Sequence, residues 1–167
     1  GDTGIMAVRS QRSPSATLTI RHTRVHGWDD PRSDLAVGVK IREKVVAILD
    51  GNAFFGNKLA IWASDYDPLV PFRPVAMSLT LTNNLLYGNS TALRCDPQLE
   101  SLHVWHNTFG LGNGATVKLA TAARRSAFAN NLFVNTTVPD ECRDGSNMRV
   151  DDRGVMNAAA NDYRLAP

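Results

Sequence analysis

One short sequence phrase recurs five times along the chain and indicates a fold built from repeated units. In each copy a large apolar residue stands three positions before a Thr or Asn, and another stands two positions after it. These Thr and Asn positions, called anchors below, are Thr23, Asn52, Asn84, Asn107 and Asn131. Successive anchors are 29, 32, 23 and 24 residues apart. A period of this length is typical of solenoids, in which each coil buries its inner face against its neighbours.

The large apolar residues beside the anchors are the predicted core. Those before the anchors are Ile20, Leu49, Leu81, Val104 and Phe128, and those after them are Val25, Phe54, Leu86, Phe109 and Phe133. Removing one of these side chains is expected to destabilise the fold strongly, because a buried aromatic leaves a large cavity.

A second apolar run follows each of the first four anchors, at residues 37–41, 59–63, 92–95 and 116–119. Apolar and polar residues alternate in these runs, which predicts strands. Gly and Asn between the two runs of each repeat predict tight bends. Since no window shows a sustained helical stripe, the sequence predicts an all-β chain wound as a parallel β-helix solenoid of about five to six coils.

Residues 81–89, 104–109 and 128–135 resemble the coils of right-handed parallel β-helix proteins of the pectate-lyase-like group. The resemblance extends over about residues 3 to 165, and it implies a right-handed winding in which the Asn anchors stack as a ladder at the bend. Residues 161–167 resemble the segment after the last coil of many secreted members. We therefore expect a secreted or cell-surface location, which includes the periplasm.

The 167 residues are expected to form one β-helix domain, with residues 136–167 as a C-terminal cap or tail. The formal net charge is +2, from 18 basic and 16 acidic residues, without a basic cluster that would indicate nucleic-acid binding. No run of about 18 apolar residues predicts a membrane span.

Residues 4–10 match the second strand of a coil whose first strand and anchor are missing. An open first coil exposes strand edges and apolar side chains. We therefore expect this chain to be the C-terminal part of a longer β-helix, or another chain to supply the preceding coils. The alternative is an irregular N-terminal strand that serves as its own cap.

The two cysteines do not form a disulfide framework. Cys95 is predicted to face the core as a small apolar residue. Cys142 lies two coils further on, about 9.6 Å away along the stack, which is longer than a disulfide spans unless the tail shifts. Their redox state stays open.

Candidate ligand-binding residues occupy the outward positions of the second strands, namely Lys40, Trp62, Arg94 and Lys118. Stacked at strand spacing, they form a stripe of three cations and one aromatic ring about 15 Å long. Arg and Lys bind carboxylate or sulfate groups, and Trp packs on the apolar face of a sugar ring. The stripe thus predicts an acidic polysaccharide as partner, the alternative being a solvated strand face.

The residues beside the stripe extend this candidate site. Arg42 and Asp96 occupy the next outward position, and Asp65 and Tyr66 stand in the connection that follows the strand of Trp62. The connection carries prolines and aromatic residues, so it is expected either to wall a groove or to pack on the coil.

Two kinds of catalysis fit these residues. In β-elimination on a uronic acid, Lys40 or Lys118 would act as the base and Arg94 would neutralise the substrate carboxylate. A glycoside hydrolase would instead pair Asp65 or Asp67 with Asp96 across about 5 to 9 Å.

Neither constellation settles whether the chain is an enzyme, because a non-catalytic adhesin, spike or assembly module would use the same coils. The sequence contains no metal-binding spacing. A calcium ion is therefore implied only by the resemblance, since many lyases of this group use one.

Overall fold

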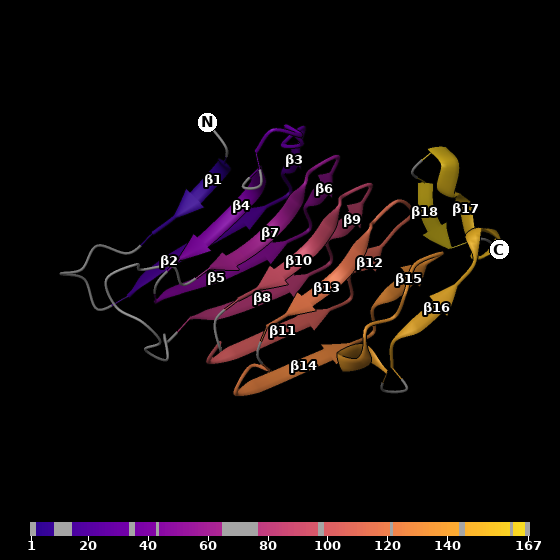
Figure 1. Ribbon diagram of the computed structural model, residues 1–167. Helices are drawn as coiled ribbons and strands as arrows, with labels where there is room; N and C mark the ends of the chain where they lie inside the picture. Colours follow the sequence, from indigo (N-terminus) through magenta and orange to yellow (C-terminus); the bar gives the residue numbers. More distant parts are fainter. Residues whose placement is uncertain are drawn as a thin grey trace.

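The protein is described by a computed structural model, which covers residues 3–8, 15–33, 36–42, 44–64, 77–96, 99–120, 122–143, 146–160 and 162–165. The chain folds as a parallel β-helix, with three parallel sheets that run along the stack of coils (Figure 1). This confirms the fold class that the repeat predicts.

Each sheet collects one strand from successive coils. Sheet A contains β1 (Thr3–Ala7), β4 (Val37–Arg42), β7 (Leu59–Ser64), β10 (Thr91–Cys95) and β13 (Ala115–Leu119). Sheet B contains β2 (Ala16–Arg21), β5 (Val45–Asp50), β8 (Ser78–Thr82), β11 (Ser101–Trp105) and β14 (Arg125–Ala129). Sheet C contains β3 (Arg24–His26), β6 (Ala53–Phe55), β9 (Leu85–Tyr87), β12 (Thr108–Phe109), β15 (Leu132–Val134) and β16 (Met148–Val150).

The C-terminal segment adds three short 3-10 turns and an antiparallel pair of strands. The turns are η1 (Asp140–Cys142), η2 (Asp152–Gly154) and η3 (Ala158–Ala160), and the strands are β17 (Val155–Asn157) and β18 (Asp162–Leu165). None of the helices in the described part of the chain has the length and apolarity that a membrane span requires.

The anchors form the predicted ladder between sheets B and C. In Asn84, for example, Oδ1 accepts hydrogen bonds from both the backbone N and Nδ2 of Asn52, each at 3.0 Å. The same pair of bonds joins Asn84 to Asn107 and Asn107 to Asn131. Each Asn is buried, so these bonds satisfy amide groups that would be costly to leave unpaired.

The structure also shows two features that the anchor phrase does not reveal. Asn147 is a further rung, because its Oδ1 accepts from the backbone N of Asn131 at 3.0 Å and from Asn131 Nδ2 at 2.8 Å. A second ladder joins Asn57, Asn89 and Asn113 at the bend between sheets C and A. Each coil therefore has three strands rather than two, since the residues after the anchors form the short strands of sheet C.

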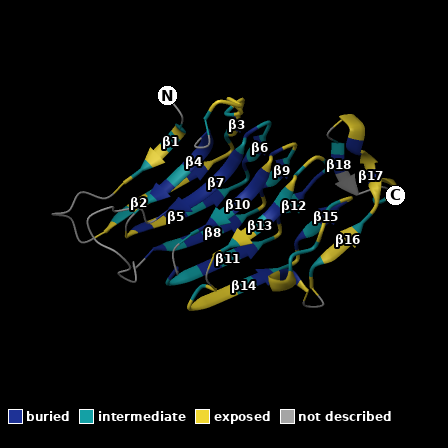
Figure 2. Cartoon of the chain, in the orientation of Figure 1, coloured by how far each residue is buried: buried dark blue, intermediate teal, exposed yellow. Residues whose placement is uncertain are grey.

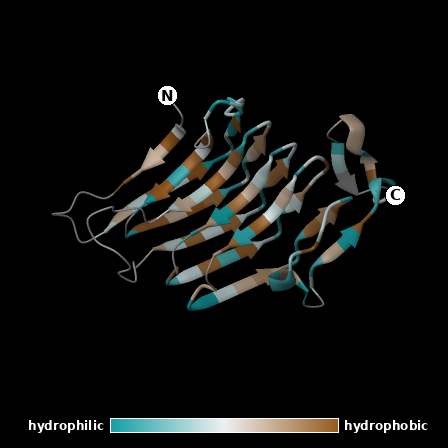
Figure 3. Cartoon of the chain, viewed as in Figure 1, coloured by the Kyte–Doolittle hydropathy of each residue, from teal (hydrophilic) through white to brown (hydrophobic). Residues whose placement is uncertain are grey.

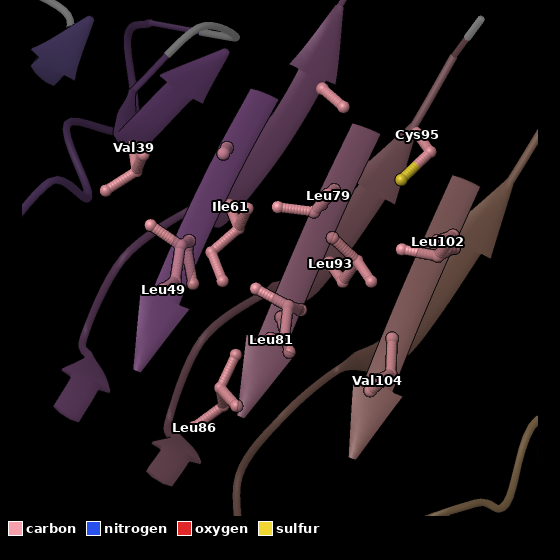
Figure 4. Close-up of a cluster of buried hydrophobic side chains, with 14 of the residues drawn as sticks. Val39, Leu49, Ile61, Leu79, Leu81, Leu86, Leu93, Cys95, Leu102 and Val104 are labelled. Atoms are coloured by element: carbon pink, nitrogen blue, oxygen red, sulfur yellow. The ribbon is translucent and has the colours of Figure 1, made fainter. Parts of the chain in front are cut away.

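The core lies between the three sheets. All ten predicted core residues are buried, from Ile20 at 7% exposed to Phe109 and Phe133 at 0%. Leu49, Leu81 and Val104 from sheet B face Val39, Ile61 and Leu93 from sheet A across the interior (Figure 4). Brown and teal segments alternate along the strands when hydropathy is mapped on the chain (Figure 3).

Both cysteines are buried, and neither forms a disulfide bond. Cys95 faces the core, as predicted, and burial raises the pKa of its thiol far above the ordinary value. Cys142 joins the same core from η1. The short turn η1 thus contributes one buried side chain, that of Cys142, to the C-terminal end of the core.

A column of aromatic rings runs along the outer face of sheet C. His26 stacks on Phe55 with ring centroids 4.6 Å apart, and Phe55 stacks on Tyr87 at 5.1 Å. The next coil has Gly110 at this position, and a Cβ on Gly110 would overlap the Tyr163 ring. Tyr163, from β18, therefore fills the place of the missing side chain, where it contacts Tyr87 and its hydroxyl accepts from the backbone N of Leu111 at 3.1 Å.

Within the described residues, the terminal strands of each sheet have a hydrogen-bonded neighbour on one side only. These strands are β1, β2 and β3 at the N-terminal end and β13, β14 and β16 at the C-terminal end, where η1 adds the buried Cys142 to the core. The exposed outer residues of β1 are prominent in Figure 2, and they include Met6, which is 59% exposed. β1 belongs to sheet A, in agreement with the predicted match of residues 4–10 to a second strand.

Candidate functional site

Strand register brings the four predicted stripe residues into one column on the outer face of sheet A. Lys40 pairs with Trp62, Trp62 with Arg94, and Arg94 with Lys118. Met6 of β1 pairs with Lys40 and extends the column by one strand. Val39, Ile61 and Leu93 point into the core, so the residues after them project outward.

Trp62 does not present an open ring face, contrary to the expectation of an exposed aromatic. It is only 7% exposed. Lys40 Nζ lies 4.1 Å from the centre of its ring, and Arg94 Cζ lies 5.4 Å from it. Since Lys40 comes from the preceding strand and Arg94 from the following one, the indole is held between two cations that its π-system attracts.

The first residues of the sheet A strands depart from strict alternation and help to bury Trp62. Ala60 and Ala92 belong to the main core, whereas Val37 and Leu59 form a separate small cluster with Trp62. Gly38 lies at the corresponding inward position, where a Cβ would be 2.8 Å from the Ala60 carbonyl oxygen. The bend at the second ladder thus turns Val37 and Leu59 outward, where they support the indole.

Asp96 joins Trp62 and Arg94 through one carboxylate. Its Oδ2 accepts from Trp62 Nε1 at 2.7 Å, and its Oδ1 accepts from Arg94 Nε at 2.7 Å. Both are short bonds to an ionised acceptor, the second being charge-assisted on both sides. Asp96 therefore fixes two neighbours of the column at once, instead of standing free for a ligand.

The cations of the column differ in their surroundings. Lys118 is exposed, whereas Lys40 and Arg42 are half-buried. Partial burial, followed by the charge of Arg42, lowers the pKa of Lys40 from its ordinary value, and the charge of Asp96 opposes this shift. The Arg94 side chain is 43% exposed. Solvent thus reaches the charged ends of the column while the indole between them is covered.

A second outward column lies on sheet B, where Arg21, Asp50, Thr82 and Trp105 are in register. Asp50 Oδ1 accepts from Thr82 Oγ1 and Asn83 Nδ2, each at 3.0 Å. These bonds, with a smaller effect of Arg21, lower the pKa of Asp50. The carboxylate is engaged by its own sheet, and this column brings together no nucleophile, base and acid.

Three predicted residues, Asp65, Tyr66 and Asp67, lie outside the described residues. The carboxylate pair of a hydrolase therefore stays a prediction. Among the residues that the structure describes, no group of three or more His, Cys, Asp or Glu side chains is arranged to hold a metal ion. The described part of the site thus consists of Lys40, Arg42, Arg94 and Lys118 around the Trp62–Asp96 pair.

Comparisons with protein-family models, with curated proteins and with solved structures find no match for this chain.

Proposed function

We propose that this β-helix binds an acidic polysaccharide along the outer face of sheet A. The observation that carries the proposal is the register of Lys40, Arg94 and Lys118 on one column, with Arg42 beside it. Membership of the pectate-lyase-like group and a secreted or cell-surface location are parts of the same proposal, and the resemblance of the coils supports them.

The column suits a chain of anionic sugars for a physical reason. Neighbouring strands are about 4.8 Å apart, so Arg94 and Lys118 are one strand apart and Lys40 is two strands from Arg94, which gives a row of cations along the stack. Guanidinium and ammonium groups bind carboxylate and sulfate oxygens. Because the cationic ends are accessible and the indole is covered, binding relies on charge and hydrogen bonds rather than on stacking of a sugar on Trp62.

Paired alanine variants test the proposal. Arg94→Ala removes a cation from the sheet A column, and Arg21→Ala removes one from sheet B, so both lower the net charge by the same amount. We expect Arg94→Ala to weaken binding to polygalacturonate, alginate or a sulfated glycan about five- to tenfold, with Arg21→Ala close to wild type. Equal loss in both variants, or binding to neutral dextran as tight as to the anionic glycans, would contradict the proposal.

A lyase reaction is the proposed activity if the bound glycan is cleaved. Lys40 Nζ would take the proton from the carbon next to the uronate carboxylate, while Arg94 neutralises that carboxylate. The released electron pair forms a carbon–carbon double bond, and the glycosidic oxygen leaves with its bonding pair and takes up a proton. The lowered pKa of Lys40 supports its role as base.

The double bond gives this step its own measurement. We expect ultraviolet absorbance to rise on incubation with polygalacturonate or alginate, and Lys40→Met to abolish the rise while leaving part of the binding. Binding without any rise would retain the binding function and exclude β-elimination on these glycans.

A second candidate function is a structural or assembly module. It is favoured by the one-sided pairing of β1, β2 and β3, because unpaired strand edges are templates for strands of another segment or chain. Analytical ultracentrifugation over a range of concentrations tests this candidate. Concentration-dependent association that is lost when Met6 is replaced by Lys would support it, and a monomer at all concentrations would exclude self-association.

A further inference from the structure

We propose that Asp96 is a positioning residue that holds Arg94 in one orientation for the incoming anion. The inference rests on the proposed function of the sheet A column and adds a specific role for a carboxylate of the same sign as the ligand. It is carried by the two hydrogen bonds of Asp96 and by the contact between Arg94 and Trp62.

Arg94 is restrained from two directions. Its Nε donates to Asp96 Oδ1 at 2.7 Å, which fixes one edge of the guanidinium. Its Cζ lies 5.4 Å from the centre of the Trp62 ring, which places the indole beside it. The indole is itself fixed, because Nε1 donates to Asp96 Oδ2 at 2.7 Å. Asp96, Trp62 and Arg94 thus form a closed set of three contacts across two neighbouring strands.

The restraint leaves a defined part of Arg94 for a ligand. With Nε engaged, the two Nη groups are the donors that remain, and the side chain keeps 43% of its surface exposed. Two adjacent N–H donors match two oxygens of one carboxylate or sulfate group. An arginine held in this way loses less conformational entropy on binding than a free one. Asp96 therefore contributes to affinity through Arg94 although its own charge repels the anion.

The negative charge of Asp96 and its positioning of Arg94 predict opposite effects of Asp96→Asn on glycan affinity. Asp96→Asn removes a negative charge from the site, so electrostatics alone predicts tighter binding of a polyanion. If Asp96 positions Arg94, the same substitution weakens binding about threefold, the effect of freeing one long side chain. Glu100→Gln is the matched control, because Glu100 pairs with Arg124 and Arg125, whereas the carboxylate bonded to Arg94 and Trp62 is that of Asp96. We expect the control to bind as tightly as wild type or more tightly.

A double-mutant cycle tests whether Asp96 acts through Arg94. Arg94→Lys keeps the positive charge but removes the Nε donor. We expect it to weaken polygalacturonate binding about as much as Asp96→Asn, and the double variant to be no weaker than Arg94→Lys alone. Additive losses would overturn the proposal, because they would mean that Asp96 affects binding independently of Arg94. A parallel titration with dextran sulfate compares the binding of sulfate and carboxylate groups by the Arg94 guanidinium.

A measurement without glycan separates this proposal from the proposed function. In nitrogen-15 NMR spectra of the free protein, we expect the Arg94 Nε–H and Trp62 Nε1–H signals to be protected from exchange in wild type and to lose protection in Asp96→Asn. If protection is lost in Asp96→Asn but no glycan binds to the wild-type protein, the proposed function is contradicted and the positioning of Arg94 by Asp96 is supported. If the Arg94 signal exchanges as fast in wild type as in the variant, the positioning role of Asp96 is overturned whatever the glycan data show.

Discussion

The outer faces of sheets A and C each carry a column of stacked side chains, and the two columns have opposite chemistry. On sheet A, Trp62 is held between Lys40 and Arg94. On sheet C, aromatic rings contact one another, and the column ends on Tyr163 from the C-terminal hairpin, which is formed by β17 and β18. One column carries charge at its accessible ends, whereas the other uses its outward surface to hold a segment of the same chain.

An outward position in a solenoid is therefore not by itself a binding position. The coil repeat places one side chain from each coil in register, whatever the residue. What distinguishes the sheet A column is that its charges remain accessible. On sheet C, Tyr163 joins Val134, Val155 and Ala158 in a second apolar cluster outside the coils. Tyr163 docks on sheet C, whereas ligand binding on sheet A is the function that we propose.

The largest expected effect tests whether both columns depend on one core. Phe109→Ala removes a fully buried ring that stacks on Phe133 at 5.0 Å. We expect a loss of about 3 to 5 kcal/mol in the free energy of unfolding, measured by urea denaturation. Thr108→Ala, on the same strand but half-buried, is the control and should cost less than about 1 kcal/mol. A loss below about 1 kcal/mol for Phe109→Ala would refute the core assignment.

A smaller effect is expected when the sheet C column loses its last ring. Tyr163→Ala should lower the free energy of unfolding by about 1 to 3 kcal/mol, since an aromatic contact and a buried ring are lost. Amide hydrogen exchange should quicken in residues 155–163, and glycan affinity should stay at the wild-type value. Tyr163→Phe removes only the hydroxyl that accepts from Leu111 and should cost about 1 kcal/mol. A loss of glycan affinity in Tyr163→Ala would contradict the proposal that the glycan binds to sheet A independently of the Tyr163 contacts on sheet C.

Salt should separate the two columns further. Exposed charges are screened over a Debye length of about 8 Å at 0.15 M, so affinity for an anionic glycan should fall as salt rises. The contact of Tyr163 with Tyr87 is apolar, and protection of the hairpin from exchange should not fall with salt. Isothermal titration and hydrogen exchange at matched salt concentrations measure the two responses. A glycan affinity that is independent of salt would remove the argument from charge.

The smallest effect concerns the titration of Lys40. Burial and Arg42 lower the pKa of Lys40 in the folded state below its value in the unfolded state. Between these two pKa values the unfolded state binds more protons, so the free energy of unfolding rises with pH. Below the folded pKa, the burial penalty on the cation is fully present. Because Asp96 raises this pKa, Asp96→Asn should lower it further. Carbon-13 NMR of the lysine side chains measures the midpoint, and an unchanged midpoint in the variant would contradict the charge coupling.

The coils were predictable because the anchor phrase repeats. A polar residue flanked by apolar ones recurs at Asn52, Asn84 and Asn107, and the resemblance to parallel β-helix proteins implied that these amides stack as a ladder, as the structure shows. The strands of sheet C were missed because two or three residues are too few for a period to be recognised. Asn147 was missed because it follows Asn131 by only 16 residues and lacks the apolar residues at both flanking positions.

The candidate site was predictable in its membership but not in its contacts. Alternation from Val39 onward places Lys40 outside, and the register then aligns Trp62 and Arg94 with it. Alternation carries no information on the bend that turns Leu59 outward, and it does not say which way a long side chain leans along the column. The bonds of Asp96 to Trp62 and Arg94, which cover the indole, follow from those unpredicted directions.

The docking of the Tyr163 ring at Gly110 bears on the order in which parts of the chain fold. The Asn ladder joins residues 16 to 32 positions apart, whereas the bond from the Leu111 backbone N to the Tyr163 hydroxyl joins residues 52 apart. Loop-closure entropy favours the shorter connections first. The hairpin docks at Gly110 beside the Tyr87 ring, so we expect Tyr163 to become buried only after the coils of Tyr87 and Phe109 have stacked.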